Sequence, residues 1–548
     1  MRRTGIAAAL LLMVAAAQTF SPGPQVVTFL SDVDDSDQPY ALYVPRNYSP
    51  DRTWPLVVSL HGAGSNHRLN LRRVFGKGNL PGESDVLASR VFPPLGDVDY
   101  IVASPLARGD MGYRGIGEKD VLDVLADVKR RFRVDPDRVY LTGLSLGGGG
   151  ALWLGMTRPD IWAAVAAVCP AVPDGLEELA GNLQNVPVKV FQGEIDPVVP
   201  AVQTRAWVQR LRDAGVAVEY AEYRSVRHNA WDTAYRDRAI FEWFGHHRRV
   251  SKPTRVQFAA DSYARASAYW LRLEKLTPGT AASATAELRD RRLEVSTKNL
   301  SGFRVDTAAA PSRPVSAVID GQTVTLRQTG PLVFRRDASG KGWSTAGATV
   351  SQANEKQPGA EGPVGAATSV RHVYVYGTED NPEVEELIRR RETAMHAANW
   401  SSPKQPLQLQ LKVLADKEVR DAEYPNQVLF GNRLTNGRLA ALAPRLPFHL
   451  NPSAADYGLV YVYPSGGGYV VVSSGLPWWT RLDQANRPGL PWVAPAWRTL
   501  QSFGDFILFR GGLDHVIVEG RFDNQWQLPA EALEKMRATG VVEFGEGR

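Results

Sequence analysis

A single serine, Ser145, stands between glycines in the stretch RVYLTGLSLGGGGAL of residues 138–152. The residues before it favour a β-strand and those after it favour a helix, so the chain turns sharply at this serine. Gly143 and Gly147, two residues to either side, leave room for such a turn. The spacing predicts a serine nucleophile held at the carboxyl end of a strand, and the plainer alternative is a turn residue in a glycine-rich loop.

A serine hydroxyl is nearly inert at neutral pH, so it needs a base to accept its proton and an acid to orient that base. Asp196 follows a predicted strand at residues 188–193, and His228 follows another at residues 218–223. In a parallel sheet, both loops lie at the same edge as the serine. We therefore predict Ser145 as the nucleophile, His228 as the general base and acid, and Asp196 as the orienting acid.

Each partner of the serine has an alternative interpretation. Asp196 also suits a turn ahead of Pro197, and His228 also suits an ordinary surface loop. Asp174 is the rival acid, because it too follows a predicted strand.

Attack on an acyl carbon creates an oxyanion, which backbone N–H groups aimed at it stabilise. The strand at residues 55–62 leads into His-Gly-Ala-Gly, and the helix after the serine begins at Leu146. A helix N-terminus favours negative charge. We therefore assign the N–H groups of Ala63 and Leu146 to the oxyanion hole, and we expect His61 to brace the loop rather than to act in catalysis.

Alternating strands and helical segments extend over residues 26–250 and predict one α/β domain with a mostly parallel sheet covered on both faces. The clearest helix is expected at residues 117–132. Strands are expected at residues 41–45, 55–62, 99–105, 138–143, 162–169, 188–193 and 218–223.

The second half of the chain has a different texture. Residues 253–350 alternate short strands, with a hairpin turn at Asp320-Gly321, and predict a small β-rich domain. Residues 351–370 are rich in Gly, Ala and Pro, which predicts a linker or surface loop. Residues 371–548 predict a C-terminal α/β domain of unknown role. It has a helix at residues 381–400 and strands at residues 372–377, 409–416, 426–431, 457–463, 468–475 and 515–520.

Five motifs together carry a family resemblance: LHGAGSN, DPDRVYLTGLSLGG, RPDIWAAVAAVCP, VFQGEIDPVVP and HNAWD. They resemble the α/β-hydrolases of the carboxylesterase and polyhydroxybutyrate-depolymerase-like branch, which includes feruloyl and acetylxylan esterases. The resemblance covers about residues 27–250. It implies an α/β-hydrolase domain that transfers an acyl group to water through Ser145, His228 and Asp196 without a cofactor.

The same region is similar to the catalytic domains of prolyl-oligopeptidase-type peptidases. Those enzymes place a β-propeller ahead of the hydrolase, whereas here the hydrolase pattern follows the N-terminal leader directly. This difference favours an ester substrate over a peptide.

Two regions could shape the substrate site. Tyr113 and Arg114, in the glycine-rich residues 108–120, are candidates for the cleft. An insertion at residues 67–85 suits either an acidic substrate or local salt bridges, and it carries Arg68, Arg72, Arg73 and Lys77. Carbohydrate stacking or a buried core would each explain the tryptophans of the C-terminal half: Trp478, Trp479, Trp492, Trp497 and Trp526.

The charge and the cysteine content exclude several classes. A formal net charge of +5 over 548 residues, without a recognition motif, argues against nucleic-acid binding. Cys169, the single cysteine, permits no intrachain disulfide and is expected in the core. No His, Cys or Asp cluster has metal-ligand spacing, so no metal is expected.

The first residues, MRRTGIAAALLLMVAAAQ, predict a secretory signal peptide over residues 1–17. The alternative is an uncleaved anchor, but the apolar run is shorter than the ~20 residues that a span needs. The mature protein is therefore expected to be secreted or periplasmic, with no transmembrane segment.

The sequence as a whole predicts an exported serine hydrolase acting on a small-molecule or polymer-borne ester, with carbohydrate as an additional candidate ligand. A prolyl-oligopeptidase-like peptidase is the first alternative. A non-catalytic binding protein on a hydrolase scaffold is the second.

Overall fold

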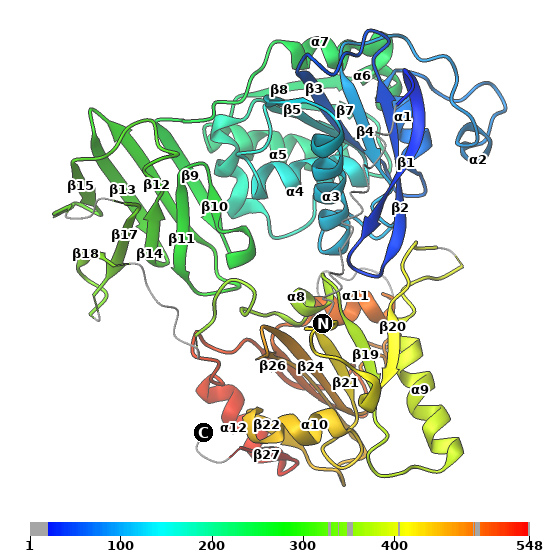
Figure 1. Cartoon of the computed structure of the whole chain (residues 1–548), viewed down its shortest axis with the longest axis vertical. Coiled ribbons are helices and arrows are strands. Elements are labelled where there is room, and N and C mark those ends of the chain that lie inside the picture. The colour runs from blue at the N-terminus through cyan, green and yellow to red at the C-terminus, as the bar shows by residue number, and fades with distance from the viewer. Residues whose placement is uncertain are drawn as a thin grey trace, which may run out of the picture.

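The computed structural model describes residues 20–326, 330–337, 339–347, 355–403, 406–485, 487 and 494–545. These residues form three domains, coloured from blue through green to red along the chain in Figure 1. The predicted signal peptide at residues 1–17 lies outside the described residues. Among the described helices, none combines the length and apolar composition needed to cross a membrane.

The N-terminal domain is built on an eight-stranded sheet in the order β1-β2-β4-β3-β5-β6-β7-β8. Its first two strands are antiparallel, and the strands from β4 to β8 pair in parallel. This is the α/β-hydrolase fold expected from the sequence. The strands are β1 Gly23–Ser31, β2 Ser36–Val44, β3 Trp54–Leu60, β4 Ile101–Pro105, β5 Val134–Leu144, β6 Ala164–Val168, β7 Val188–Gly193 and β8 Val218–Tyr223.

Helices cover both faces of this sheet, as the buried central strands require. One apolar core joins the sheet to α3, α4 and α5, and a second joins its other face to α1 and α7. The helices are α1 His67–Val74, α2 Asp85–Ala88, α3 Ile116–Arg131, α4 Leu146–Thr157, α5 Ala201–Asp213, α6 Trp231–Ala234 and α7 Ala239–Gly245, with a 3₁₀ helix at Glu177–Asn185.

The middle domain consists of two five-stranded sheets that share one apolar core, which confirms the predicted β-rich domain. Asp320 and Gly321, both with positive φ, form the predicted hairpin turn between β15 and β16. The strands are β9 Arg255–Ala260, β10 Ser267–Ala268, β11 Leu271–Leu276, β12 Ala282–Arg289, β13 Arg292–Lys298, β14 Leu300–Val305, β15 Ser316–Ile319, β16 Gln322–Val324, β17 Leu332–Arg336 and β18 Trp343–Ala346.

The C-terminal domain has a seven-stranded mixed sheet in the order β20-β19-β21-β24-β23-β25-β26, which confirms the predicted α/β class. Its strands are β19 Val373–Tyr376, β20 Lys412–Ala415, β21 Gln427–Phe430, β22 Phe448–Leu450, β23 Tyr457–Ser465, β24 Gly468–Gly475, β25 Phe506–Arg510, β26 Val516–Gly520 and β27 Val542–Phe544. Its helices are α8 Val364–Thr368, α9 Val384–Ala398, α10 Gly437–Leu442, α11 Ala496–Ser502 and α12 Ala530–Thr539.

The segment expected as a linker, residues 351–370, is a structural joint from residue 355 onward. Lys356 is buried in an ion pair with Asp505 of the C-terminal domain. The buried Glu361 carboxylate accepts backbone hydrogen bonds from Tyr263 and Ala264 of the middle domain. The local composition predicted only a loop. The contacts that order the segment could not be predicted from it, because the partners lie far away along the sequence.

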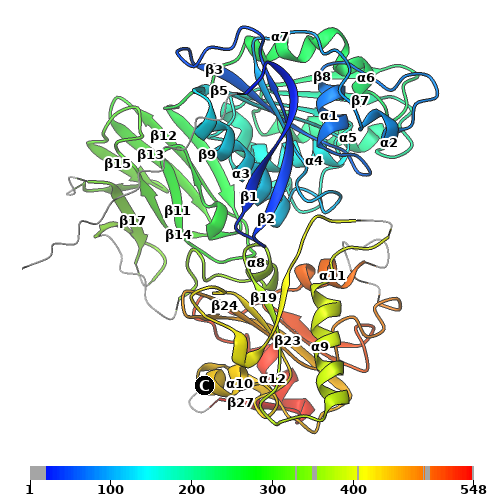
Figure 2. The ribbon, with the colours of Figure 1, turned by 45° about the vertical axis from the view of Figure 1, so that its right-hand side comes forward.

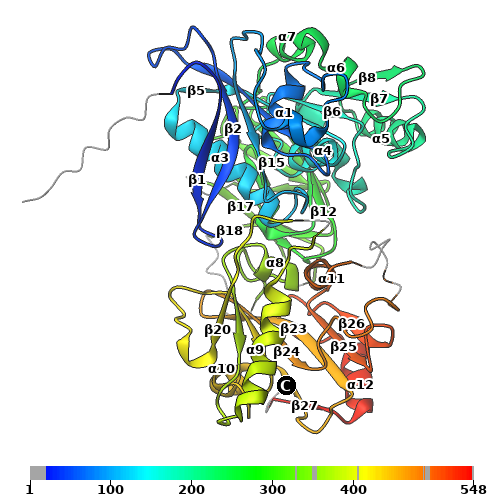
Figure 3. The same ribbon diagram turned by 90° about the vertical axis from the view of Figure 1, so that its right-hand side faces the viewer.

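The hairpin of β1 and β2 points from the hydrolase toward the C-terminal domain in all three views (Figures 1, 2 and 3). Val33, at its tip, lies in a small apolar cluster with Ile116, Trp400, Leu407 and Trp497. The rings of Trp400 and Trp497 stack with centroids 5.1 Å apart. Apolar burial therefore joins the first and third domains directly.

The Lys356–Asp505 pair gives a test of the joint. Lys356→Ala leaves the Asp505 carboxylate buried without its cation, so the free energy of unfolding of the C-terminal domain should fall by about 3 kcal/mol. Denaturant unfolding followed by circular dichroism measures the change. Lys535→Ala, which removes an exposed pair with Glu531, is the control and should cost less than about 0.5 kcal/mol. Equal losses in the two variants would contradict the assignment.

Candidate active site

Ser145 lies at the turn between β5 and α4, with the positive φ of 54° typical of a strained residue. The flanking glycines are required by close backbone contacts. A Cβ on Gly143 would lie 2.1 Å from the Gly147 carbonyl oxygen, and one on Gly147 would lie 2.3 Å from the Leu60 carbonyl oxygen. No side chain fits at either position, which is the steric role that the sequence pattern suggested.

The loops after β5, β7 and β8 bring the three predicted catalytic side chains together. His228 Nε2 lies 2.9 Å from Ser145 Oγ, and His228 Nδ1 lies 2.7 Å from Asp196 Oδ2. The Asp196 carboxylate is fully buried and the His228 side chain is 19% exposed. Asp174, the rival acid, is exposed, and its backbone carbonyl accepts a hydrogen bond from Arg114.

The surroundings of Asp196 keep its carboxyl ionised. Burial raises its pKa, but hydrogen bonds from His228 and from the N–H groups of Val199 and Val198 outweigh burial and hold the pKa below its ordinary value. Gln192 Nε2 also donates to Asp196 Oδ2. An ionised carboxylate at Nδ1 favours the tautomer whose Nε2 can accept the serine proton.

The predicted oxyanion donors lie on the two segments that meet at Ser145. Gly62 is packed so closely that a Cβ there would lie 3.3 Å from Ser145 Cβ, and the next residue is Ala63. Leu146 is the first residue of α4. Within the described part of the chain, neither the Ala63 nor the Leu146 N–H donates a hydrogen bond to a protein group. Both groups remain available to an anion. The position of Leu146 at a helix N-terminus favours a negative charge there.

His61 braces the oxyanion loop rather than facing the serine. Its ring nitrogens lie 2.9 Å from the Gly62 carbonyl and 2.8 Å from the Leu106 carbonyl. The Tyr113 hydroxyl donates to the His61 carbonyl at 2.8 Å. Gly64 donates its N–H to Asp110 Oδ1 at 2.8 Å.

The two residues proposed for the substrate cleft behave differently. Tyr113 is only 5% exposed and supports the oxyanion loop, so its assignment to the cleft is corrected. Arg114 is exposed, and its guanidinium lies over the Trp153 ring at 4.4 Å while donating to the Asp174 carbonyl. A cleft role for Arg114 stays a prediction.

The family comparison agrees with this architecture. Residues 35–210 match the model of a family described as "Putative esterase". Feruloyl esterase D of Neurospora crassa is 25% identical over 189 residues, which is 34% of this chain and 61% of that protein. The resemblance to α/β-hydrolase esterases is confirmed.

Two further proteins are similar. "Putative esterase NocK" of Nocardia uniformis subsp. tsuyamanensis is 41% identical over 68 residues, or 12% of this chain and 20% of that protein. The solved structure of a thermostable esterase is 26% identical, covers 41% of this chain and 63% of that one, and has a TM-score of 0.34. The chain spans less than two thirds of the length of each of these relatives.

Cys169 is a neighbour of the site that the sequence did not suggest. Its buried thiol donates to the His228 carbonyl at 3.3 Å, and burial raises its pKa to about 12. Cys169, Asp196 and His228 are the one group of side chains in the described ranges whose atoms could hold a metal, all within 4.8 Å of one another. The short Asp196–His228 hydrogen bond and the protonated thiol fit a proton-transfer site better.

Other charged and aromatic side chains form local salt bridges or pack in the protein interior. In the insertion, Arg72 pairs with Glu83 and Arg73 pairs with Asp85, so these two arginines form local salt bridges. Trp231 presents its ring edge-on to His228 with centroids 5.3 Å apart. In the C-terminal half, Trp492 lies outside the described residues, and a buried core accounts for Trp478, Trp497 and Trp526.

The position of Asp196 leads to a prediction that separates it from its rival. Asp196→Asn removes the charge that stabilises the imidazolium, so kcat for a hydrolysed ester should fall by about 10³- to 10⁴-fold. Asp174→Asn is the matched control and should leave kcat within about twofold. Steady-state kinetics of both variants measures this, and a large loss in the Asp174 variant would overturn the assignment.

Proposed function

We propose that this protein is an exported serine hydrolase that cleaves carboxylic esters. The observation that supports this proposal best is the unbroken hydrogen-bonded series from Ser145 Oγ through the His228 ring to the buried Asp196 carboxylate. Its distances of 2.9 Å and 2.7 Å are those that activation of a serine hydroxyl needs. The esterase family match over residues 35–210 supports the same chemistry.

The reaction proceeds in two halves. His228 Nε2 accepts the Ser145 hydroxyl proton while Oγ attacks the acyl carbon. The N–H groups of Ala63 and Leu146 donate to the resulting oxyanion, and Asp196 stabilises the imidazolium. The imidazolium then gives its proton to the leaving alcohol, and an acyl-enzyme remains.

Water completes the cycle. His228 accepts a proton from the attacking water, the tetrahedral intermediate forms again, and the proton returns to Ser145 Oγ as the acid leaves. Over the whole cycle the ester and one water become the acid and the alcohol, and Ser145 regains its proton from that water. The similarity to Feruloyl esterase D of Neurospora crassa makes feruloyl esters natural members of a substrate panel.

Covalent labelling tests the proposal. A fluorophosphonate should add once to the mature protein and not at all to Ser145→Ala, because an activated serine displaces the fluoride. Ser251→Ala, at an exposed serine, is the control and should label like the parent. Intact-protein mass spectrometry reads the adduct. A folded parent that takes up no label would overturn the proposal and favour the non-catalytic binding protein.

A substrate panel separates esterase from peptidase. Short acyl esters and aryl esters should be hydrolysed faster than proline- or arginine-directed peptide amides. The opposite order of kcat/KM would favour the prolyl-oligopeptidase-like alternative.

Export is a separate proposal that rests on the leader. Expression of the full-length chain in a secreting host should yield a mature protein outside the cytoplasm that begins at Gln18. N-terminal sequencing of the purified protein checks the cleavage site. Recovery of the intact chain in the membrane fraction would instead support an uncleaved anchor.

A further inference from the structure

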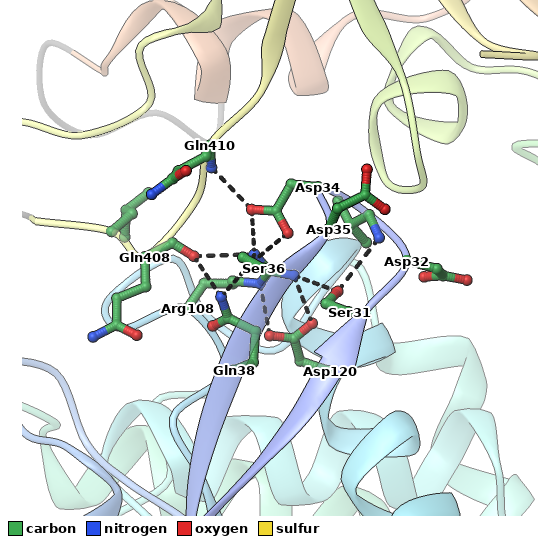
Figure 4. Close-up of polar contacts among 12 residues, drawn as sticks. Ser31, Asp32, Asp34, Asp35, Ser36, Gln38, Arg108, Asp120, Gln408 and Gln410 are labelled. Atoms are coloured by element: carbon green, nitrogen blue, oxygen red, sulfur yellow. Dashed lines mark hydrogen bonds and ion pairs between the residues drawn. The ribbon is translucent and has the colours of Figure 1, made fainter. Parts of the chain in front are cut away.

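Arg108, in the loop between β4 and α3, has no exposed side-chain surface. Figure 4 shows its guanidinium enclosed by the hydrolase on one side and by residues 408 and 410 of the C-terminal domain on the other. Nε bonds to Asp120 Oδ2 at 2.7 Å, Nη1 bonds to Asp34 Oδ2 at 2.8 Å, and Nη2 bonds to Ser31 Oγ at 2.5 Å. A charge this deeply buried must be neutralised by such fixed partners.

The C-terminal domain supplies backbone partners to the same loop. The Gln408 N–H donates to the Arg108 carbonyl at 3.1 Å, and the Arg108 guanidinium donates back to the Gln408 carbonyl at 3.0 Å. Gly109 and Leu407 form an antiparallel β-bridge. The segment at residues 407–410 therefore pairs with this loop as a short strand would.

The acid beside Arg108 is also held from both domains. Gln410 N–H donates to Asp34 Oδ2 at 2.9 Å. Burial raises the pKa of Asp34, but hydrogen bonds from Ser36, Gln410 and Arg108 outweigh it and keep the pKa below its ordinary value. The carboxylate thus stays charged against the guanidinium.

The loop that these contacts hold is strained. Three consecutive residues have positive φ: 47° at Ala107, 67° at Arg108 and 95° at Gly109. Only glycine adopts this region without cost, so the conformation at Ala107 and Arg108 persists only because the surroundings impose it. The buried ion pairs and the pairing with residues 407–410 are the contacts that do so.

The strained residues connect directly to the oxyanion loop. On one side of them, the Leu106 carbonyl lies 2.8 Å from His61 Nε2. On the other side, Asp110 Oδ1 accepts the Gly64 N–H at 2.8 Å. His61 and Gly64 flank Ala63, so the loop fixes the oxyanion loop both before and after the predicted donor.

We infer that Arg108 is a positioning residue through which the C-terminal domain holds the Ala63 N–H in place for catalysis. The inference rests on the proposed function and extends it, because it makes the third domain part of the active-site scaffold. Without the network, the loop at residues 106–110 relaxes and the Ala63 donor moves away from the developing oxyanion. Substrate binding elsewhere in the cleft is unaffected.

If Arg108 only held the two domains together, its loss would affect activity no more than the loss of another arginine at this junction. Arg371 is the matched control for that case. Arg371 of the C-terminal domain pairs with Asp35 at 2.7 Å and donates to the Asp32 carbonyl, at the same β1–β2 hairpin. In the described structure, it makes no hydrogen bond or ion pair with residues 106–110. Loss of Arg371 weakens the junction between the domains without touching the oxyanion loop.

The experiment compares Arg108→Gln with Arg371→Gln in the full-length chain. Arg108→Gln should lower kcat for a short acyl ester by about 10- to 100-fold, leave KM within about twofold, and weaken a trifluoromethyl ketone inhibitor in parallel with kcat. Arg371→Gln should leave kcat and inhibitor affinity within about twofold. Equal effects of the two variants, or a change in melting temperature alone, would overturn the inference.

A second pair covers the case in which Arg108→Gln does not fold. Gln410→Pro removes the N–H that holds Asp34, while Gln410→Ala keeps it, and the Gln410 side chain is exposed. The proline variant should lose kcat and inhibitor affinity together, and the alanine variant should lose neither. Fluorophosphonate labelling of the parent distinguishes a failure of the proposed function from a failure of this inference. An unlabelled parent counts against the proposed function, whereas a labelled parent with no difference between the paired variants counts against this inference.

Discussion

The first turn of α4 packs very closely against the carboxyl edge of the sheet. This close packing constrains the other parts of the site. A Cβ on Gly148 would lie 2.7 Å from the Val168 carbonyl oxygen, one on Gly149 would lie 1.9 Å from the Ala171 carbonyl oxygen, and one on Gly150 would lie 2.4 Å from the Tyr113 ring. The first turn of the helix therefore excludes every side chain from its inner face. That approach leaves Ser145 at a positive φ and places the helix N-terminus beside its hydroxyl.

The same close packing couples the elbow to the oxyanion loop. Tyr113 presses its ring against Gly150 and donates its hydroxyl to the His61 carbonyl, so one buried side chain contacts both α4 and the loop after β3. Gly62 packs against Ser145 directly. The two segments that carry the proposed donors are thus fixed against each other, which is the preorganisation that stabilisation of an oxyanion requires.

Local sequence patterns predicted helices and strands of the hydrolase domain closely. The helix expected at residues 117–132 is α3 Ile116–Arg131, and the strand expected at residues 218–223 is β8 Val218–Tyr223. Such elements are encoded within a dozen residues, and the order of parallel strands then places their loops together. The contacts of Arg108 were not foreseeable, because Asp34 and Gln408 lie 74 and 300 residues away along the chain. Cys169 was expected in the core but not beside His228, since a turn with φ of 44° directs it there.

The junction between the first and third domains contains both apolar contacts and buried charges, and the two have different roles. Apolar contacts of Val33, Trp400 and Trp497 already stabilise the association. A buried ion pair contributes little net stability beside such contacts, because the desolvation of each charge offsets most of the attraction. A guanidinium does, however, fix the directions of its partners, since its planar N–H groups bond at set angles. At Arg108 those directions set the backbone of the loop that holds His61 and Gly64. The buried charge therefore positions this loop rather than stabilising the association of the two domains.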